Sequence, residues 1–496
     1  MMEIDINKPF DPLLIQSLAV ELQLRIGTLP KVDVYSFHLE ACAGDIIQCL
    51  RVEPRSLSEI SRTVRAARTM KLSVRGMGEA SGSEKAIYVD RYTVLIDCCK
   101  LADKPRMELV MCHREGDNKD TPGLRVLAGV TITELINFMV RKKVELYQSP
   151  DMIPGIGTVV GNIVTASPGV YGPSSGALGG CLADEVISMR VVNSCGDLVE
   201  YSDPHKLEQY CANMGLLGVV YNVTLRYREL TTSVVQFEFQ DWCRILNSRS
   251  INHYFRNSDL TELIYLPYNH LRSGQSLRHD WVPYMDEVII RSTKRLFTLY
   301  DEDLSCAPRH YFHIIDPVMG PDQRQIASFP EEGDSLIGKV YKVLKNELSA
   351  ANMQTQYTPW AMTCLAPFPS PVRMLRFAIE TCCTMDPFFD FMRTFLEMLM
   401  QMVRNEENND VFYGTNLCIR VNFTGGNRTA KLLGVGSLNP TEDVGRRLIA
   451  HITFASLVRP GISKEWRDFS ERITNFTFGC IPRSSLHWKT EWHTLR

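Results

Sequence analysis

The sequence has no CxxC pair, although it contains 15 cysteines, and this absence removes the usual redox and zinc spacings. A chain of 496 residues can bury a core without disulfides. We therefore expect reduced thiols in an intracellular compartment. The adjacent pairs Cys98–Cys99 and Cys382–Cys383 are predicted to be small buried hydrophobes rather than redox centres.

The sequence also has no long apolar run and no strong charge excess. Its most apolar stretch, FFDFMRTFLEMLMQMV, is interrupted by Asp390, Arg393 and Glu397 and is shorter than the ~20 residues that a membrane span needs. It predicts an amphipathic helix. The N-terminus lacks a basic leader before an apolar run, so we expect no signal peptide and a cytoplasmic location. A net charge of -3 gives no reason to expect nucleic acid as a partner.

Regular elements begin near Val52 and predict two small α+β lobes. Ser56 and Glu59 have capping-box spacing before an apolar helical face, and a strand, LSVRG, follows. The pattern repeats with the strand RVLAGV and a second capping box at Thr131 and Glu134. Strands then follow over 186–193, 198–202 and 219–230.

Beyond residue 230 the pattern changes. Alternating strands such as CIRVNF and HITFASL are mixed with helices such as LIGKVYKVLKNEL. This mixture is typical of an antiparallel sheet backed by helices. The predicted fold class is therefore α+β, with two or three packed units, because the chain is too long for one ordinary core.

Glycines gather in two places that could hold a phosphate. Gly76, Gly78 and Gly82 follow the strand LSV, where missing Cβ atoms would let backbone N–H groups approach an anion. A simple turn is the alternative. A nicotinamide-binding Rossmann site is disfavoured, because that fingerprint needs a helix directly after the glycines and here another strand follows.

The second glycine-rich stretch runs over 150–180 and is too punctuated to be one regular element. Its glycines are Gly155, Gly157, Gly161, Gly169, Gly172, Gly176, Gly179 and Gly180. A loop of this length is usually functional. Together the two loops, on adjacent lobes, could grip one pyrophosphate.

The order of these segments resembles the FAD-binding domain, of the PCMH type, of the vanillyl-alcohol-oxidase superfamily. PRSLSEISRTVRAARTMKLSVRGMGEASGS, RVLAGVTITELINFM, GIGTVVGNIVTASPG, DEVISMRVVNSCGDLVEYS and MGLLGVVYNVTLRY occur in the family's order. The resemblance implies an N-terminal extension over 1–45 and an FAD-binding domain over 46–230. It further implies a substrate-binding cap domain over 231–470 and a C-terminal segment over 471–496 that packs on the flavin domain.

The resemblance also implies which residues bind FAD. They come from the two loops and from the segment GLLGVV. The predicted set is Arg75, Gly76, Met77, Gly78, Glu79, Ala80, Ser81, Gly82, Gly155, Gly157, Thr158, Gly161, Asn162, Ser167, Gly169, Gly218, Val219 and Val220.

Within the superfamily, GLLGVV and the C-terminal EWRDFSERIT and LHWK resemble the aldonolactone oxidases, such as D-arabinono-1,4-lactone oxidase. Such enzymes oxidise an alcohol group of a small sugar lactone by hydride transfer to flavin. The likeness implies that Arg420 and Lys489 stabilise negative charge on the reduced ring and that His487 accepts a proton. An aromatic tail packed on the first domain is the alternative for residues 487–489.

Four positions depart from the family pattern. Glu79 replaces the histidine that often tethers FAD, so we expect FAD to be held non-covalently. Pro168 replaces a histidine of the second loop, and Lys489 directly follows Trp488 where the family has one residue between them. Cys418 stands where a carboxylate would pair with Arg420, and a buried arginine is costly unless paired.

Two alternatives stay open. The same scaffold could oxidise a sterol or other hydrophobic alcohol, or it could bind flavin without turnover. His310 and His313 are the best candidates for metal ligands, but no HExxH is present and we expect no metal site. The sequence favours neither dioxygen nor another electron acceptor and indicates no oligomeric state.

Overall fold

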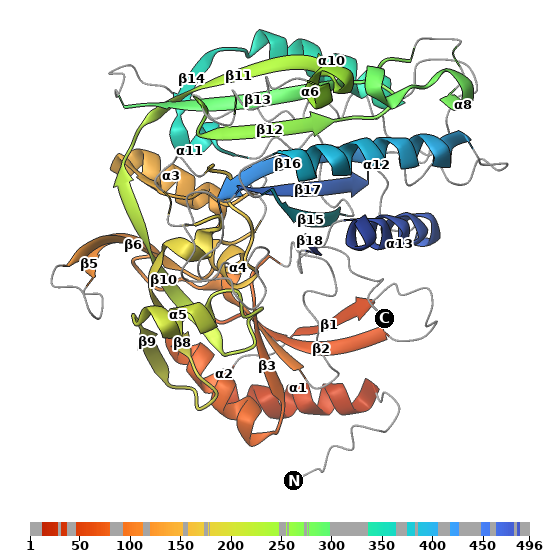
Figure 1. The fold of residues 1–496 in the computed structure, drawn as a ribbon. Helices are drawn as coiled ribbons and strands as arrows, with labels where there is room; N and C mark the ends of the chain where they lie inside the picture. Colours follow the sequence, from red (N-terminus) through yellow and green to blue (C-terminus); the bar gives the residue numbers. More distant parts are fainter. Residues whose placement is uncertain are drawn as a thin grey trace.

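The computed structural model describes much of the chain, in ranges separated by gaps. The described residues are 12–27, 31–36, 46–79, 93–112, 120–151, 157–172, 177, 179–247, 254, 257–271, 275, 277–297, 336–363, 374–381, 385–404, 417–425, 448–456, 463–480 and 484–486. Within them the strands form three sheets. Figure 1 shows the eight-stranded sheet on one side of the molecule and the two smaller sheets on the other.

The four-stranded sheet has the order β1-β2-β4-β3. Its elements are α1 (Pro12–Ile26), β1 (Lys31–Ser36), β2 (Ile46–Val52), α2 (Leu57–Thr69), β3 (Ser73–Met77) and β4 (Thr93–Asp97). β4 pairs in parallel with β2 and β3, whereas β1 pairs antiparallel with β2. Residues of the predicted N-terminal extension therefore contribute a strand to this sheet, and the buried Leu22 of α1 belongs to its core.

The six-stranded sheet has the order β5-β6-β10-β8-β9, and β7 also pairs with β10. Its strands are β5 (Met107–Cys112), β6 (Thr121–Leu127), β7 (Val144–Leu146), β8 (Val186–Val192), β9 (Leu198–Tyr201) and β10 (Val219–Glu229). The helices around it are η2 (Cys98–Lys100), α3 (Ile132–Lys142), α4 (Val159–Val164), η4 (Leu182–Glu185) and α5 (Pro204–Tyr210). The strands predicted over 186–193 and 198–202 are confirmed as β8 and β9, which pair antiparallel.

Both predicted helix starts are confirmed. Thr131 and Glu134 form a full reciprocal capping box at α3. Ser56 caps α2 by accepting the backbone N–H of Glu59, but the Glu59 carboxylate accepts the N–H of Arg55 instead of returning to Ser56. Each cap satisfies an N–H group that has no partner within the helix.

The eight-stranded sheet is antiparallel, as predicted, with the order β14-β11-β13-β12-β16-β17-β15-β18. Its strands are β11 (Thr232–Asp241), β12 (Leu260–Tyr265), β13 (Glu287–Leu296), β14 (Gln354–Tyr357), β15 (Met374–Glu380), β16 (Leu417–Gly425), β17 (Leu448–Ser456) and β18 (Ser484–Leu486). The helices associated with it are α6 (Trp242–Asn247), α8 (Leu277–Asp280), η5 (Pro283–Met285), α10 (Leu336–Ala350), α11 (Thr358–Ala361), α12 (Asp386–Arg404) and α13 (Ser463–Cys480).

The two faces of this sheet differ sharply in polarity. On β16, Ile419, Val421 and Phe423 are buried in the apolar core, and Phe423 packs edge-on against Phe388 of α12. Successive side chains of a strand point to opposite faces. Arg420, Asn422 and Thr424 therefore share the other face, which lies toward the second glycine loop, because Asn422 Nδ2 donates to Gly169 O at 3.1 Å.

The described part of the C-terminal segment lies against the eight-stranded sheet. β18 pairs with β15 of the eight-stranded sheet, and Ile473 of α13 is buried in the core of that sheet. Residues 471–480 and 484–486 thus pack on the eight-stranded sheet, because α13 has apolar residues that this core buries. Residues 487–496 lie outside the described residues.

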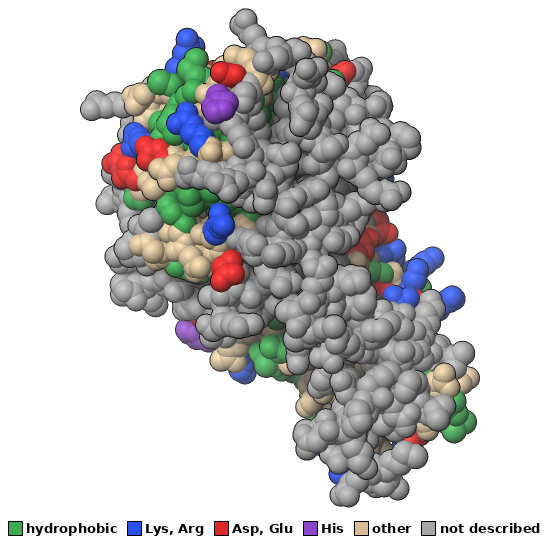
Figure 2. All heavy atoms as spheres, turned by 90° about the vertical axis from the view of Figure 1, so that its right-hand side faces the viewer, with side chains coloured by type: hydrophobic (Ala, Val, Ile, Leu, Met, Phe, Trp, Pro, Cys, Tyr) green, Lys and Arg blue, Asp and Glu red, His purple; other side chains and the backbone are tan. Residues whose placement is uncertain are grey.

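None of the helices in the described ranges combines the length and hydropathy needed to span a bilayer. α12 is amphipathic, as predicted, and buries Phe388, Met392 and Leu399. Cys98 is buried and Cys99 is half-buried, and both are free thiols. Figure 2 shows basic and acidic described side chains interspersed on one face. Cys382 and Cys383 lie outside the described residues.

Truncating a side chain in the core of the eight-stranded sheet should strongly lower the free energy of unfolding. Leu399 is fully buried on α12, whereas Leu24 of α1 is 81% exposed. We expect Leu399→Ala to cost about 2–5 kcal/mol of unfolding free energy, since it leaves a cavity, and Leu24→Ala to cost under about 0.5 kcal/mol. Urea unfolding followed by tryptophan fluorescence measures both; equal midpoints for the two variants would contradict the assigned core.

Candidate functional site

The two glycine loops meet in space. Gly157 N–H donates to the Glu79 carboxylate at 2.5 Å, although the two residues are 78 positions apart. A Cβ added at Gly78 would lie 2.4 Å from Thr158 Oγ1. Only glycine allows this close approach of the first loop to the start of α4.

A third segment joins them at the start of β10. Gly76 faces Val219, whose Cγ1 would lie 3.5 Å from a Cβ at position 76. Arg75 donates to Met214 O at 2.8 Å, and burial lowers the pKa of its guanidinium. Gly218 has a φ of +124°, which side chains rarely adopt. Segments 75–79, 157–158 and 214–219 therefore lie together in the structure.

The second loop is more regular than its glycine content indicates. It contains the short helix α4, capped by Thr158, whose hydroxyl accepts the N–H of Gly161 at 3.1 Å. Asn162 is buried and donates to Thr158 O at 2.9 Å. Ser167 is buried and bonds Thr165 Oγ1 at 3.2 Å. These predicted residues lie on one compact turn.

Gln148 organises the remainder of that loop. Its Oε1 accepts the backbone N–H groups of Val170 at 3.0 Å and Tyr171 at 2.9 Å, while its Nε2 donates to Gly179 O at 3.1 Å. A Cβ at Gly169 would lie 2.1 Å from Gln148 Cδ, so this position also needs glycine. The loop is thus fixed where it faces the eight-stranded sheet.

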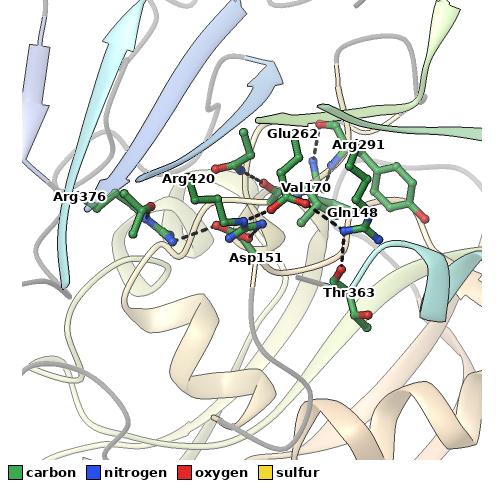
Figure 3. A network of polar contacts seen from close by, with 12 residues as sticks. Gln148, Asp151, Val170, Glu262, Arg291, Thr363, Arg376 and Arg420 are labelled. Atoms are coloured by element: carbon green, nitrogen blue, oxygen red, sulfur yellow. Dashed lines mark hydrogen bonds and ion pairs between the residues drawn. The ribbon is translucent and has the colours of Figure 1, made fainter. Parts of the chain in front are cut away.

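The polar face of that sheet carries a buried ion network (Figure 3). Arg420 pairs with Asp151 at 2.5 Å and with Glu262. Arg376 of β15 reaches the other oxygen of Asp151 at 3.0 Å. Arg291 pairs with Glu262 at 3.0 Å and donates to Thr363 O at 2.8 Å. All five charged side chains are at least nine-tenths buried.

Glu262 is the carboxylate that pairs with Arg420, in place of the acid that Cys418 replaces. The partner carboxylate of Arg420 comes from the neighbouring strand β12, where Ile264 is opposite Arg420 and Glu262 is opposite Asn422. Cys418 is buried, and burial raises the pKa of its thiol well above the usual range. It is a neutral packing residue, and Arg420 is not left without an acid.

Asp151 joins the second glycine loop to the sheet. Burial by itself would raise the pKa of this carboxyl, but the charges of Arg420 and Arg376 outweigh burial and lower it. Asp151 is therefore ionised and holds two arginines at the border between the loop and the sheet.

His451 of β17 is a buried neutral histidine on the same face, opposite Asn422. Burial and the charge of Arg376 lower its pKa from 6.5 to about 3. Its Nε2 lies 2.9 Å from Thr424 Oγ1, and that hydroxyl donates to Gly425 O at 3.1 Å. Nε2 then carries the proton, and Nδ1 is left as an acceptor.

The buried atoms on this face that lack a hydrogen-bond partner among the described residues include His451 Nδ1 and Asn422 Oδ1. Because Asn422 Nδ2 is fixed on Gly169 O, its oxygen has a defined orientation. Buried acceptors are costly unless a donor reaches them. This pair suits a donor such as a hydroxyl group.

Several residues of this network were not predicted. Asp151, Glu262, Arg291, Arg376 and His451 come from separate segments. Glu262, Arg376 and His451 do leave a signal, because each is a titratable side chain in a mostly apolar strand, where charges are rare unless paired. Asp151 leaves a weaker signal, since the sequence shows only that an acidic residue precedes the glycines of the second loop.

The other predicted residues lie outside the described residues: Ala80, Ser81, Gly82, Gly155, His487, Lys489, His310 and His313. Pro168 pairs across a bridge with Cys181. In the part of the chain that the structure describes, no group of three or more His, Cys, Asp or Glu side chains is placed to bind a metal ion.

The fold of this chain is similar to that of known structures. No family model matches the chain, and no curated protein matches its sequence. A cholesterol oxidase from Brevibacterium sterolicum superposes with a TM-score of 0.65 at 13% identity, covering 93% of this chain and 87% of that one. A solvent-stable cholesterol oxidase gives 0.66 at 15% identity, covering 93% and 88%. The chain thus has the two-domain fold of these structures.

The lowered pKa of His451 predicts acid sensitivity. Between about pH 6.5 and about pH 3 the unfolded chain binds a proton at His451 that the folded chain does not. The free energy of unfolding therefore falls as the pH falls through this window, by up to about 1.4 kcal/mol per pH unit. His451→Gln should remove that contribution, whereas His205→Gln, at an exposed position, should keep it.

Urea unfolding at several pH values between about pH 7 and about pH 4.5 measures the slope. Equal slopes for the wild type and His451→Gln would show that His451 is not a buried neutral group.

Proposed function

We propose that this chain binds FAD and oxidises an alcohol group of a small molecule by hydride transfer to the flavin. The observation that carries the proposal is the meeting of the two glycine loops, with Gly78 against Thr158, directly beside a polar sheet face. The fold is that of cholesterol oxidases, which act on an alcohol. Basic and acidic side chains are interspersed among the described residues of the face in Figure 2, which fits a small-molecule substrate.

The backbone fits a dinucleotide cofactor. Segments 76–79, 157–162 and 218–220 would hold FAD, because their glycines let these stretches of backbone come together, and backbone N–H groups of such segments can bind a diphosphate. Glu79 cannot form the covalent bond of a histidine tether, so FAD is held non-covalently. When bound, the flavin accepts the hydride from the substrate carbon.

The side chains of the sheet position the substrate and manage charge. Arg376 and Arg420 share one carboxylate, Asp151, so the three groups together carry one positive charge. That charge stabilises an oxygen as it loses its proton. His451 Nδ1 and Asn422 Oδ1 accept hydrogen bonds from substrate hydroxyls. We assign Lys489 to stabilising negative charge on the reduced ring and His487 to accepting the proton.

A sugar lactone or similar polyol is the substrate class we propose. Two arginines, an amide and a neutral imidazole on one face suit a ligand with several hydroxyl groups. A sterol is the second candidate, favoured by the likeness to cholesterol oxidases. The carboxylate of Glu262 beside Arg420 argues for a working site over a flavin-binding scaffold without turnover.

The cofactor proposal predicts a coloured protein. Purified wild type should show the visible absorption bands of flavin, and acid precipitation should release all of the colour. Gly78→Val should lower FAD affinity about 10- to 100-fold, because its side chain would collide with Thr158. Gly479→Val is the control, since a Cβ there meets nothing within 4 Å. A colourless wild type that takes up no added FAD rejects the proposal.

The substrate proposal predicts which compound reduces the flavin. Under anaerobic conditions, aldonolactones or alditols should bleach the visible bands and sterols should not. Lys489→Ala and Arg420→Lys should slow bleaching by roughly 100-fold while FAD stays bound. Bleaching by sterols alone would favour the second candidate, and unchanged rates in both variants would remove the roles of these residues.

A further inference from the structure

Glu79 occupies a position between the two glycine loops. It follows Gly78, the residue that packs against Thr158, and its carboxylate accepts Gly157 N–H at 2.5 Å. Gly157 has a φ of +86°, a backbone conformation that favours glycine. The bond therefore joins residue 79 directly to the backbone of the second loop.

An acidic side chain and a thiol, Asp97 and Cys99, lie near Glu79. Asp97, at the end of the neighbouring β4, adds a second negative charge and caps Cys99 N–H at 2.9 Å. Burial, then Asp97 and Glu79, raise the pKa of Cys99 to about 12. The neighbouring thiol thus stays neutral, and Gly157 N–H is a hydrogen-bond donor to Glu79 from the second loop.

The hydrogen bond between Glu79 and Gly157 forms at the place where the two loops are in contact. Gly78 touches Thr158 at a distance that excludes any side chain, and Glu79 bonds the residue before Thr158. Both contacts form only when the loops are together. The hydrogen bond therefore stabilises the closed arrangement relative to any arrangement in which the loops separate.

We propose that Glu79 is a positioning residue, a non-covalent latch that holds the two loops closed around FAD. The inference rests on the proposed function. In place of a covalent bond to the cofactor, the chain uses a charge-assisted hydrogen bond between its own loops. The opposite role would be competition, with Glu79 occupying an N–H group that FAD needs.

The test compares Glu79→Ala and Glu79→Gln with a matched control, Asp241→Ala. Asp241 is also a carboxylate that accepts a backbone N–H, from Arg244 at 2.8 Å, but it lies on the eight-stranded sheet. FAD affinity is measured by titrating each apoprotein and following flavin fluorescence. Hydrogen–deuterium exchange of the peptide that contains Gly157 is measured in parallel without FAD.

We expect Glu79→Ala to weaken FAD binding by about tenfold or more and to speed exchange at Gly157, because a charged hydrogen bond is lost. Glu79→Gln, which keeps an acceptor, should lie between Ala and the wild type. Asp241→Ala should match the wild type in both measurements. If Glu79→Ala unfolds, the near-isosteric Glu79→Gln carries the comparison.

Two failures are distinguishable. Wild type that binds FAD, with equal or tighter binding by both Glu79 variants, rejects the latch and leaves the proposed function intact; tighter binding would identify competition. Wild type that binds no FAD rejects the proposed function and with it the cofactor role of Glu79. Unchanged exchange at Gly157 in Glu79→Ala also rejects the latch.

Discussion

Asp151 holds two arginines of the eight-stranded sheet from a position at the start of the second glycine loop. The same loop meets the first glycine loop at Gly157 and bonds the sheet again through Gly169. One buried carboxylate thus fixes the distance between the glycine loops and the polar face of the eight-stranded sheet. If this ion pair were lost, two buried positive charges would lack their shared partner, which is costly.

Burying five charges is not an efficient way to stabilise a fold. Desolvation of each ion offsets much of the attraction, and apolar residues of similar size often give equal or greater stability. The stability of the eight-stranded sheet comes from its other face, where Phe377, Phe423 and Phe454 pack with α12 and α13. We infer that the charged face is kept for its geometry and electrostatics.

A second group of polar contacts, around Glu145, connects the sheets where the chain passes from β10 to β11. Glu145 accepts Arg228 at 2.7 Å and the backbone N–H of Thr231 at 2.9 Å, and Arg295 of β13 lies 3.6 Å from the same carboxylate. Burial raises the pKa of Glu145 despite these partners. The Glu145 contacts and the Asp151 network together orient the eight-stranded sheet relative to the glycine loops.

The sequence by itself determined the local features of this protein: the capping box at Thr131, the strands with alternating polarity, the glycines at 76 and 78, and the α+β class. These depend on residues within a few positions of one another. The tertiary structure decided the partner of Arg420, the ionised state of Asp151 and the neutral state of His451. Glu262 lies 158 positions from Arg420, and only strand register brings them together. Burial and neighbouring charge set the pKa values, and both quantities exist only in the folded chain.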